Sequence, residues 1–359
     1  MKIISFFFEK NHFYLIIILL ILIPEYFFEK KFLKKYIHKK YKIKKDLFEF
    51  YLDIFRYFGQ SLILIPYFIS YCKNKKSKKK KLVNNELVIT IFPINNNNEL
   101  NDYKKILFYA FMLSMMEMFL NTLSKSIIKN NENKKFNYCE IQICSIIICY
   151  NILFNKKFYI HRKISFSIFL FILIFKLIYN FFDLNIKKGS IDMIFNFVHY
   201  FFVGFKITML KYIINYFFIS GYLLLGFEGL FDLIFYFIYY YFSFGIKKNI
   251  FNKIYCLVYL VITVLYFILH IFITFLITAF DPILYTLNSF LYLLFQYFFE
   301  NKDEFLVVNT IFNTINCFCI LIFSEVIQIN VCNLDKETKI NIIEREKNEK
   351  KLYSLDLYN

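Results

Sequence analysis

The 359 residues carry 44 Lys and Arg against 27 Asp and Glu, a formal net charge of +17, yet 58% of them are apolar and 51 are Phe. An ordinary soluble domain has about 45–50% apolar residues, and its surface of Lys, Glu, Arg and Asp interrupts the apolar runs. The composition therefore excludes an ordinary soluble domain and predicts an integral membrane protein, with the lipid bilayer as its first partner.

Apolar runs of about 17–25 residues recur along the chain, which is the length that an α-helix needs to cross a hydrocarbon core of ~30 Å. The predicted fold class is all-α, a polytopic membrane protein forming a single transmembrane domain over residues 1–359. The second and sixth runs are the weakest, since the second begins amphipathically with Glu49, Asp53 and Arg56. The ten candidate spans are about 12–28, 47–72, 104–128, 138–155, 164–182, 191–214, 217–244, 254–280, 282–299 and 304–331.

The lysines concentrate between the apolar runs and in the tail, mainly in 29–45, in 73–81 and after residue 330. Lysine-rich juxtamembrane loops face the cytosol and its anionic lipids. We therefore expect a lysine/asparagine-rich cytosolic loop at about 73–103, a cytosolic C-terminal tail at about 332–359, and anionic lipid headgroups as partners of the lysine-rich loops. Nucleic acid is not an expected partner, because no aromatic and basic RNA-binding motif accompanies the charge.

Loop charge also predicts the orientation of the chain. Lys156, Lys157 and Arg162 place the loop after the fourth span in the cytosol, and the acidic segment from Glu300 to Glu304 suits the opposite side. Both termini are then cytosolic. The lysines of 29–45 fall on the wrong side, so either the first span does not cross fully or its partners set its orientation. That span resembles a signal sequence without a small-residue cleavage site, and we expect it to be retained.

The sequence predicts neither an enzyme nor a metal or cofactor site. Six of the eight cysteines lie inside apolar runs and are interpreted as small hydrophobic residues. Cys317 and Cys319 are two positions apart, on different faces of a helix, and no CxxC pair accompanies them. The motifs GxSxG, HExxH, GxxxxGKS and the dinucleotide fingerprint are all absent.

Ionisable residues inside the predicted spans are the candidate functional groups, because each costs about 2.5–3.5 kcal/mol at membrane depth. Glu117 lies midway along the third span and either faces a central cavity or is a protonated acid bonded to a neighbouring helix. Lys206 is the best counter-charge for Glu117 or for an anionic solute, although it could also snorkel. For Lys176, late in its span, snorkelling to the headgroups is the favoured interpretation.

Two further groups of residues allow both a functional and a structural interpretation. His270, Thr274 and Thr278 recur every four residues on one face of the eighth span, either lining a pathway or bonding across packed helices. Glu228 either pairs with a lysine or, as we favour, complements the dipole at a helix start.

Several segments resemble the drug/metabolite transporter superfamily, specifically its nucleotide-sugar-transporter-like (EamA-type) solute carriers. The segment SGYLLLGFEGLF at 220–231 is similar to the family's PLQVVGWEGLFG, and its Gly226 and Gly229 are spaced for close helix packing. FRYFGQSL at 55–62 resembles the MFLGES-type segment. Ile141 and Gln142, with the basic turn that ends at His161, resemble the YQMLRGS helix and the turn after it.

The resemblance implies ten helices in two five-helix inverted repeats, with a substrate cavity near the midplane where the halves meet. It also implies an intracellular (endomembrane) compartment and a small polar metabolite, such as a nucleotide sugar, as the solute. Gln142 and Asn288 thereby join Glu117, Lys206, His270 and Thr274 as substrate-pathway candidates. The family's arginines are missing, since Cys144 falls near one of them, and Asn288 replaces an acid. The alternative is a non-transporting membrane scaffold that keeps the carrier fold; a homodimer also remains open.

Overall fold

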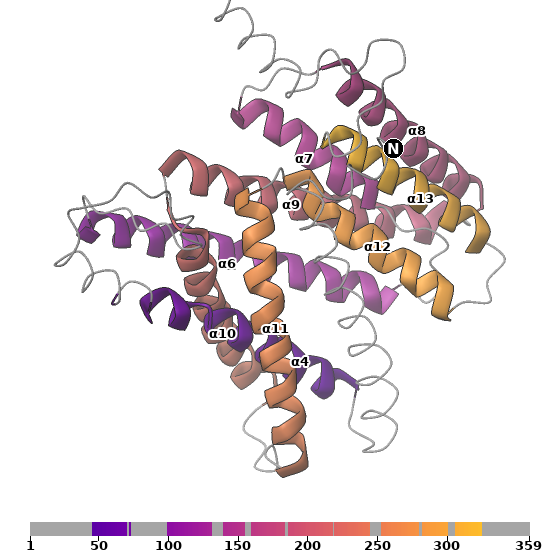
Figure 1. Ribbon diagram of the computed structural model, residues 1–359. Helices are drawn as coiled ribbons and strands as arrows, with labels where there is room; N and C mark the ends of the chain where they lie inside the picture. Colours follow the sequence, from indigo (N-terminus) through magenta and orange to yellow (C-terminus); the bar gives the residue numbers. More distant parts are fainter. Residues whose placement is uncertain are drawn as a thin grey trace, which may run out of the picture. The chain divides into compact units, whose positions relative to one another are not determined.

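The computed structural model describes residues 45–69, 72, 99–130, 139–154, 159–183, 186–217, 219–244, 253–279, 282–300 and 306–324 (Figure 1). This part of the chain is helical and contains no strand, which confirms the all-α prediction. The helices are α4 (Lys45–Ser61), α6 (Glu99–Asn130), α7 (Cys139–Phe154), α8 (Ile160–Asp183), α9 (Ile186–Phe217), α10 (Gly221–Phe244), α11 (Lys253–Ala279), α12 (Pro282–Glu300) and α13 (Leu306–Phe323).

Each predicted span from the second to the tenth overlaps one of these helices. The first span, the predicted loop up to residue 98 and the predicted C-terminal tail lie outside the described residues. α9 ends at Phe217 and α10 begins at Gly221, so the seventh helix begins a few residues later than the predicted 217.

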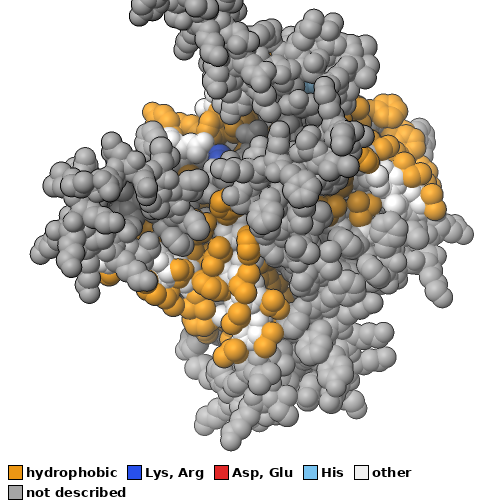
Figure 2. Space-filling model, in the orientation of Figure 1, with side chains coloured by type: hydrophobic (Ala, Val, Ile, Leu, Met, Phe, Trp, Pro, Cys, Tyr) orange, Lys and Arg blue, Asp and Glu red, His pale blue; other side chains and the backbone are white. Residues whose placement is uncertain are grey.

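Within the described residues, three helical stretches are long and apolar enough to cross a membrane: Tyr103–Ser124 in α6, Met193–Phe217 in α9 and Gly221–Tyr239 in α10. Shorter apolar stretches lie in α7, α11 and α13. Large apolar side chains are exposed, for example Phe171 at 68% and Phe242 at 81%. On the face drawn in Figure 2, hydrophobic side chains cover much of the described surface, including α11. These features indicate a membrane-embedded protein.

The described helices belong to two compact units. Unit 1 contains α7, α8, the part of α9 up to Phe205, α12 and α13. Unit 2 contains α4, nearly all of α6, the part of α9 from Lys206, α10 and α11. Each unit therefore combines helices from the first and the second half of the chain.

In unit 2, α4 packs against both α10 and α11, and glycines allow the close approach. A Cβ atom on Gly59 would lie 2.6 Å from the Thr263 backbone oxygen of α11. A Cβ on Gly229 would lie 2.9 Å from the Ser61 backbone nitrogen, and one on Gly226 would lie 2.6 Å from Leu64 Cγ. The structure thus places Gly226 and Gly229 of α10 against the second predicted span, because only a residue without a side chain leaves room there.

The second predicted span is not one continuous helix. α4 ends at Ser61, residues 62–63 form a turn, and the chain is helical again over 64–69. Pro66 explains the break, because its ring clashes with the carbonyl of residue 62 and it has no N–H to donate. The Ser61 hydroxyl donates to the Phe58 carbonyl (2.7 Å), and the Ile65 amide donates to the Leu62 carbonyl (3.0 Å). The break thus retains backbone hydrogen bonds.

In unit 1, α13 packs against α8 and α12, and α7 packs against α8 and α12. Gly204 of α9 lies against α7, where a Cβ atom would be 2.5 Å from the Gln142 backbone oxygen. The Ser145 hydroxyl of α7 donates to the Phe201 carbonyl at 2.7 Å. Arg162, in the first turn of α8, is buried and lies over the rings of Tyr159 and Phe323.

Candidate functional site

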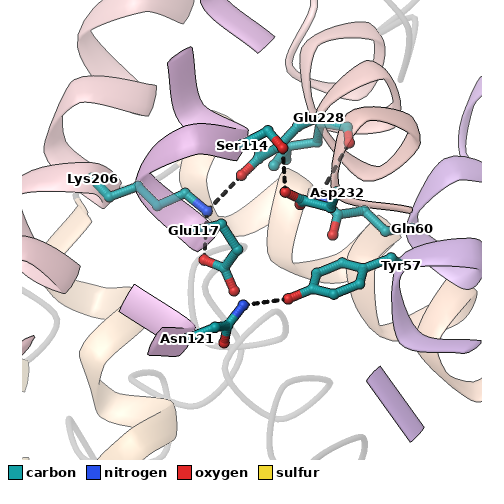
Figure 3. Close-up of polar contacts among 9 residues, drawn as sticks. Tyr57, Gln60, Ser114, Glu117, Asn121, Lys206, Glu228 and Asp232 are labelled. Atoms are coloured by element: carbon teal, nitrogen blue, oxygen red, sulfur yellow. Dashed lines mark hydrogen bonds and ion pairs between the residues drawn. The ribbon is translucent and has the colours of Figure 1, made fainter. Parts of the chain in front are cut away.

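A cluster of charged side chains in unit 2 is centred on Lys206 (Figure 3). Its ammonium Nζ lies 2.7 Å from Glu117 Oε2 and 2.5 Å from Glu228 Oε1. The structure therefore joins Glu117 and Lys206, the two charges that the sequence suggested as partners, and adds a second carboxylate to the same lysine. Figure 3 shows Lys206 reaching between the two acids.

Each residue of this ion-pair cluster comes from a different helix. Glu117 lies in the Tyr103–Ser124 stretch of α6, Lys206 in Met193–Phe217 of α9, and Glu228 in Gly221–Tyr239 of α10. All three stretches that could cross a membrane thus contribute one charge to one contact. α10 begins at Gly221, so Glu228 lies two turns inside the helix and is not the helix-start acid that we expected.

Further polar side chains extend the cluster along α10 and α4. The Ser114 hydroxyl donates to Asp232 Oδ1 at 2.5 Å, and Asp232 lies one turn after Glu228. The Asn121 amide donates to the Tyr57 hydroxyl at 2.6 Å. These contacts connect α6 to both α10 and α4 around the ion pairs.

On α4, two more side chains lie near the break in the helix. The Gln60 amide donates to the Leu225 carbonyl of α10 at 3.1 Å. The Arg56 guanidinium lies 5.9 Å from the centre of the Tyr266 ring of α11, within the range of a cation–π contact. Arg56 therefore provides a second cation in this region of unit 2.

Exposure differs sharply within the cluster. The side chains of Lys206 and Glu117 are 15% and 17% exposed, whereas those of Glu228 and Asp232 are 1% exposed. Glu228 Oε2 and Asp232 Oδ2 are buried without a hydrogen-bond partner in the described part of the chain. The cluster thus has one partly exposed edge and one buried end that holds two carboxylate oxygens without a partner in the described part of the chain.

A second buried ion pair lies in unit 1. Lys176 of α8 bonds to Glu140 Oε1 of α7 at 2.5 Å, and the Asn316 amide of α13 donates to the same oxygen at 2.7 Å. All three are at most 1% exposed, and Lys176 also lies over the Phe312 ring. The favoured prediction that Lys176 snorkels to the headgroups was wrong, because a carboxylate inside the helix packing neutralises its charge.

The other predicted pathway residues are divided between the two units. His270 of α11 is buried in unit 2 at 7% exposure. The Thr274 hydroxyl donates to the His270 carbonyl at 2.6 Å, and its methyl group lies near Gly221. Thr274 therefore satisfies its hydroxyl within its own helix at a packing contact. Gln142 of α7 is buried in unit 1, and Asn288 belongs to α12 of the same unit.

Sequence reasoning did not single out Asp232, Glu140 and Asn316, nor the uncharged side chains of Tyr57, Gln60, Ser114 and Asn121. The spacing of Glu228 and Asp232, four residues apart in an apolar stretch, was the available signal, since such a pair shares one helix face. Glu140 was visible as the single acid of the fourth span. Among the described residues, no group of three or more His, Cys, Asp or Glu side chains is arranged to hold a metal ion.

Comparison with known proteins does not place the chain in a family. No family model matches the sequence, and neither a curated protein nor a solved structure matches the chain.

Proposed function

We propose that this chain is a multi-pass membrane carrier that moves a small polar metabolite across an intracellular membrane. The observation that carries the proposal is the Lys206 cluster, to which three apolar, membrane-length helices each contribute one largely buried charged side chain. An ionisable group costs about 2.5–3.5 kcal/mol at membrane depth, and such groups mark solute and ion pathways. Apolar side chains alone can hold helices together without this insertion free energy.

Partial exposure supports a binding role for the outer edge of the cluster. Glu117 and Lys206 keep 17% and 15% of their side chains accessible. Arg56 and Tyr266 add a cation and an aromatic ring from α4 and α11. Such a mixture of charged, aromatic and amide groups suits a solute with several polar groups, which would exchange hydrogen bonds with these side chains on binding.

The pattern of helix packing supports an inverted repeat of two five-helix halves. We pair α4, α6, α7 and α8 with α10, α11, α12 and α13, so that the first predicted span, outside the described residues, would pair with α9. Under this pairing the equivalent helices pack against each other as α4 with α10, α7 with α12 and α8 with α13. A two-fold relation between the halves produces such self-paired contacts.

The α7–α8 contact also has its counterpart in α12–α13 under this pairing. The extensive α4–α11 contact and the smaller α10–α11 contact correspond only to local contacts of α6, in which Phe111 packs against Phe231 of α10 and Asn121 bonds to Tyr57 of α4. Helix breaks such as that before Pro66 are also common in transporters built from repeats.

The test is solute uptake into vesicles containing the purified chain. A panel of labelled nucleotide sugars, sugar phosphates, amino acids and small sugars would be screened against empty vesicles. We expect saturable uptake of at least one class. Lys206→Met should reduce that uptake at least tenfold, whereas Lys105→Met, on the exposed face of α6, should leave it unchanged.

Two outcomes would contradict the proposal. Folded, correctly inserted protein that takes up no member of the panel would favour a non-transporting scaffold. Uptake that Lys206→Met and Lys105→Met reduce equally would remove the Lys206 cluster from the pathway, because the effect would then follow the loss of any lysine.

A further inference from the structure

We propose that Asp232, with Glu228 one turn before it on α10, binds one exchangeable proton, and that this proton is the coupling ion of the carrier. Only the claim that the proton is the coupling ion rests on the proposed function. Proton binding by Asp232 is a property of the folded chain and is measurable whether or not a solute has been identified.

Carboxylates outnumber lysines in the Lys206 cluster. Three carboxylates, those of Glu117, Glu228 and Asp232, surround the single ammonium of Lys206. Arg56 of α4 also acts on Glu117 and Glu228, but it is shared with Asp53, which lies one turn before it. Negative charge therefore exceeds positive charge, and a dry site does not hold an uncompensated charge.

Among the three acids, Asp232 is the one without a cationic bonding partner. Glu117 and Glu228 each bond directly to the Lys206 ammonium, which favours their ionised forms. Asp232 has a neutral hydroxyl, that of Ser114, as its bonding partner. Since two carboxylates that share a dry site do not both ionise readily, the proton belongs on Asp232.

Two carboxylate oxygens at the buried end of the cluster could share the proton. Asp232 Oδ2 and Glu228 Oε2 both lack a partner in the described part of unit 2, and they belong to side chains that are 99% buried on one face of α10. A proton added to the Asp232 carboxylate converts it to a carboxylic acid whose O–H can donate to the free oxygen of Glu228. One proton then supplies both missing hydrogen bonds.

The surroundings of Asp232 suit a proton better than a metal cation. The groups facing Asp232 are Glu117 and Ser114 of α6, Lys206 of α9, Glu228 of α10 and Tyr57 of α4. His270 of α11 acts on Glu117 and Lys206 of the same cluster. The Lys206 ammonium already bonds to one oxygen of Glu117 and one oxygen of Glu228, and it would repel a metal ion placed among the acids. A proton needs one oxygen and no coordination shell.

Exchange with solvent follows from the exposed edge of the cluster. The partly exposed Glu117–Lys206 pair connects, through Lys206, to the buried Glu228. When a solute engages Glu117 or Lys206, the pairing of Glu228 changes, and with it the affinity of Asp232 for its proton. Solute binding and proton binding are thereby linked through one lysine.

The experiment is infrared difference spectroscopy on the full chain in lipid nanodiscs, titrated with pH in H₂O and D₂O. A protonated buried carboxyl group gives a C=O stretch separate from the carboxylate bands. We expect this band at neutral pH, a shift in D₂O, and its loss in Asp232→Asn. Ser114→Ala should shift the band without removing it, and Glu140→Gln, a buried acid of unit 1, should leave it unchanged.

Several results would overturn the site. These are a neutral-pH spectrum without the band, a band that survives Asp232→Asn, or a band that Na⁺ removes relative to choline. If Asp232→Asn does not fold, an unshifted band in Ser114→Ala overturns it instead.

Coupling is tested in vesicles containing an identified solute, where a pH gradient should drive accumulation in wild type and not in Asp232→Asn. Uptake that ignores the gradient would refute coupling and leave the proposed function intact. The band without any uptake would refute the proposed function, and coupling with it, while the proton site stands.

Discussion

Removing the charge of Lys206 should destabilise the protein in a way that depends on which acid is neutralised with it. Lys206→Met strands two carboxylates, Glu117 and Glu228. Breaking a buried pair by removing one partner costs about 3–5 kcal/mol, because the remaining charge is left without compensation. We expect a loss of unfolding free energy in this range for the single variant.

The two rescue variants should differ because the two acids differ in burial. Glu228 is 1% exposed and Glu117 is 17% exposed, so the stranded Glu228 carboxylate has less access to water. Adding Glu228→Gln to Lys206→Met should therefore recover more stability than adding Glu117→Gln. The triple variant should recover the most, since it leaves neither acid charged beside the missing lysine.

Unfolding in mixed detergent micelles measures these differences. The chain has no Trp but 30 Tyr, so tyrosine fluorescence reports the transition. Lys105→Met, an exposed lysine of α6, is the matched control and should change the unfolding free energy by no more than about 0.5 kcal/mol. Equal rescue by the two glutamines, or a Lys206→Met variant as stable as the control, would refute the reasoning.

Three further predictions concern packing, accessibility and orientation. Gly229→Ala should cost more stability than Gly226→Ala, by about 1 kcal/mol or more, because its Cβ meets the backbone of α4 while that of Gly226 meets mainly the Leu64 side chain; equal melting temperatures would contradict this. In a variant lacking the cysteines at 256 and 332, maleimide should label exposed Cys72 in the folded protein and buried Cys144 only after unfolding; fast labelling after Cys72→Ser would contradict it. A tag after residue 359 should be cleaved by protease in intact vesicles whose cytosolic face is outward, and its protection would reverse the predicted orientation.

The positions of the helices were the most predictable part of the structure. Span length follows from bilayer thickness, and the apolar run at 104–128, for example, lies within α6. The sixth span, predicted at 191–214 and judged weak, overlaps the long apolar stretch Met193–Phe217. Its few charges, Lys206 among them, are spaced widely enough to leave the helix apolar overall. Pro66 was a readable signal for the break after α4, but the predicted span ran through it.

The charge pairs were predictable only in part. Spacing along one helix is visible in sequence, so Glu228 and Asp232 could have been placed on one face. Pairing across helices depends on which faces meet, and Glu140 and Lys176 are separated by 36 residues. The sequence analysis therefore favoured local explanations, snorkelling for Lys176 and a dipole contact for Glu228. In the structure each residue has a partner on another helix, Glu140 for Lys176 and Lys206 for Glu228.

The Glu140 contacts also bear on the order in which the chain is assembled during synthesis. Glu140 and Lys176 lie on successive helices, α7 and α8, so the two charges meet as soon as this hairpin has been made and can enter the bilayer as a neutral pair. Asn316 reaches the same carboxylate from α13, 176 residues after it. Until α13 is synthesised, the Glu140–Lys176 hairpin lacks the hydrogen bond from Asn316, so a chain truncated before residue 306 would hold this buried carboxylate with one bond fewer than the full chain does.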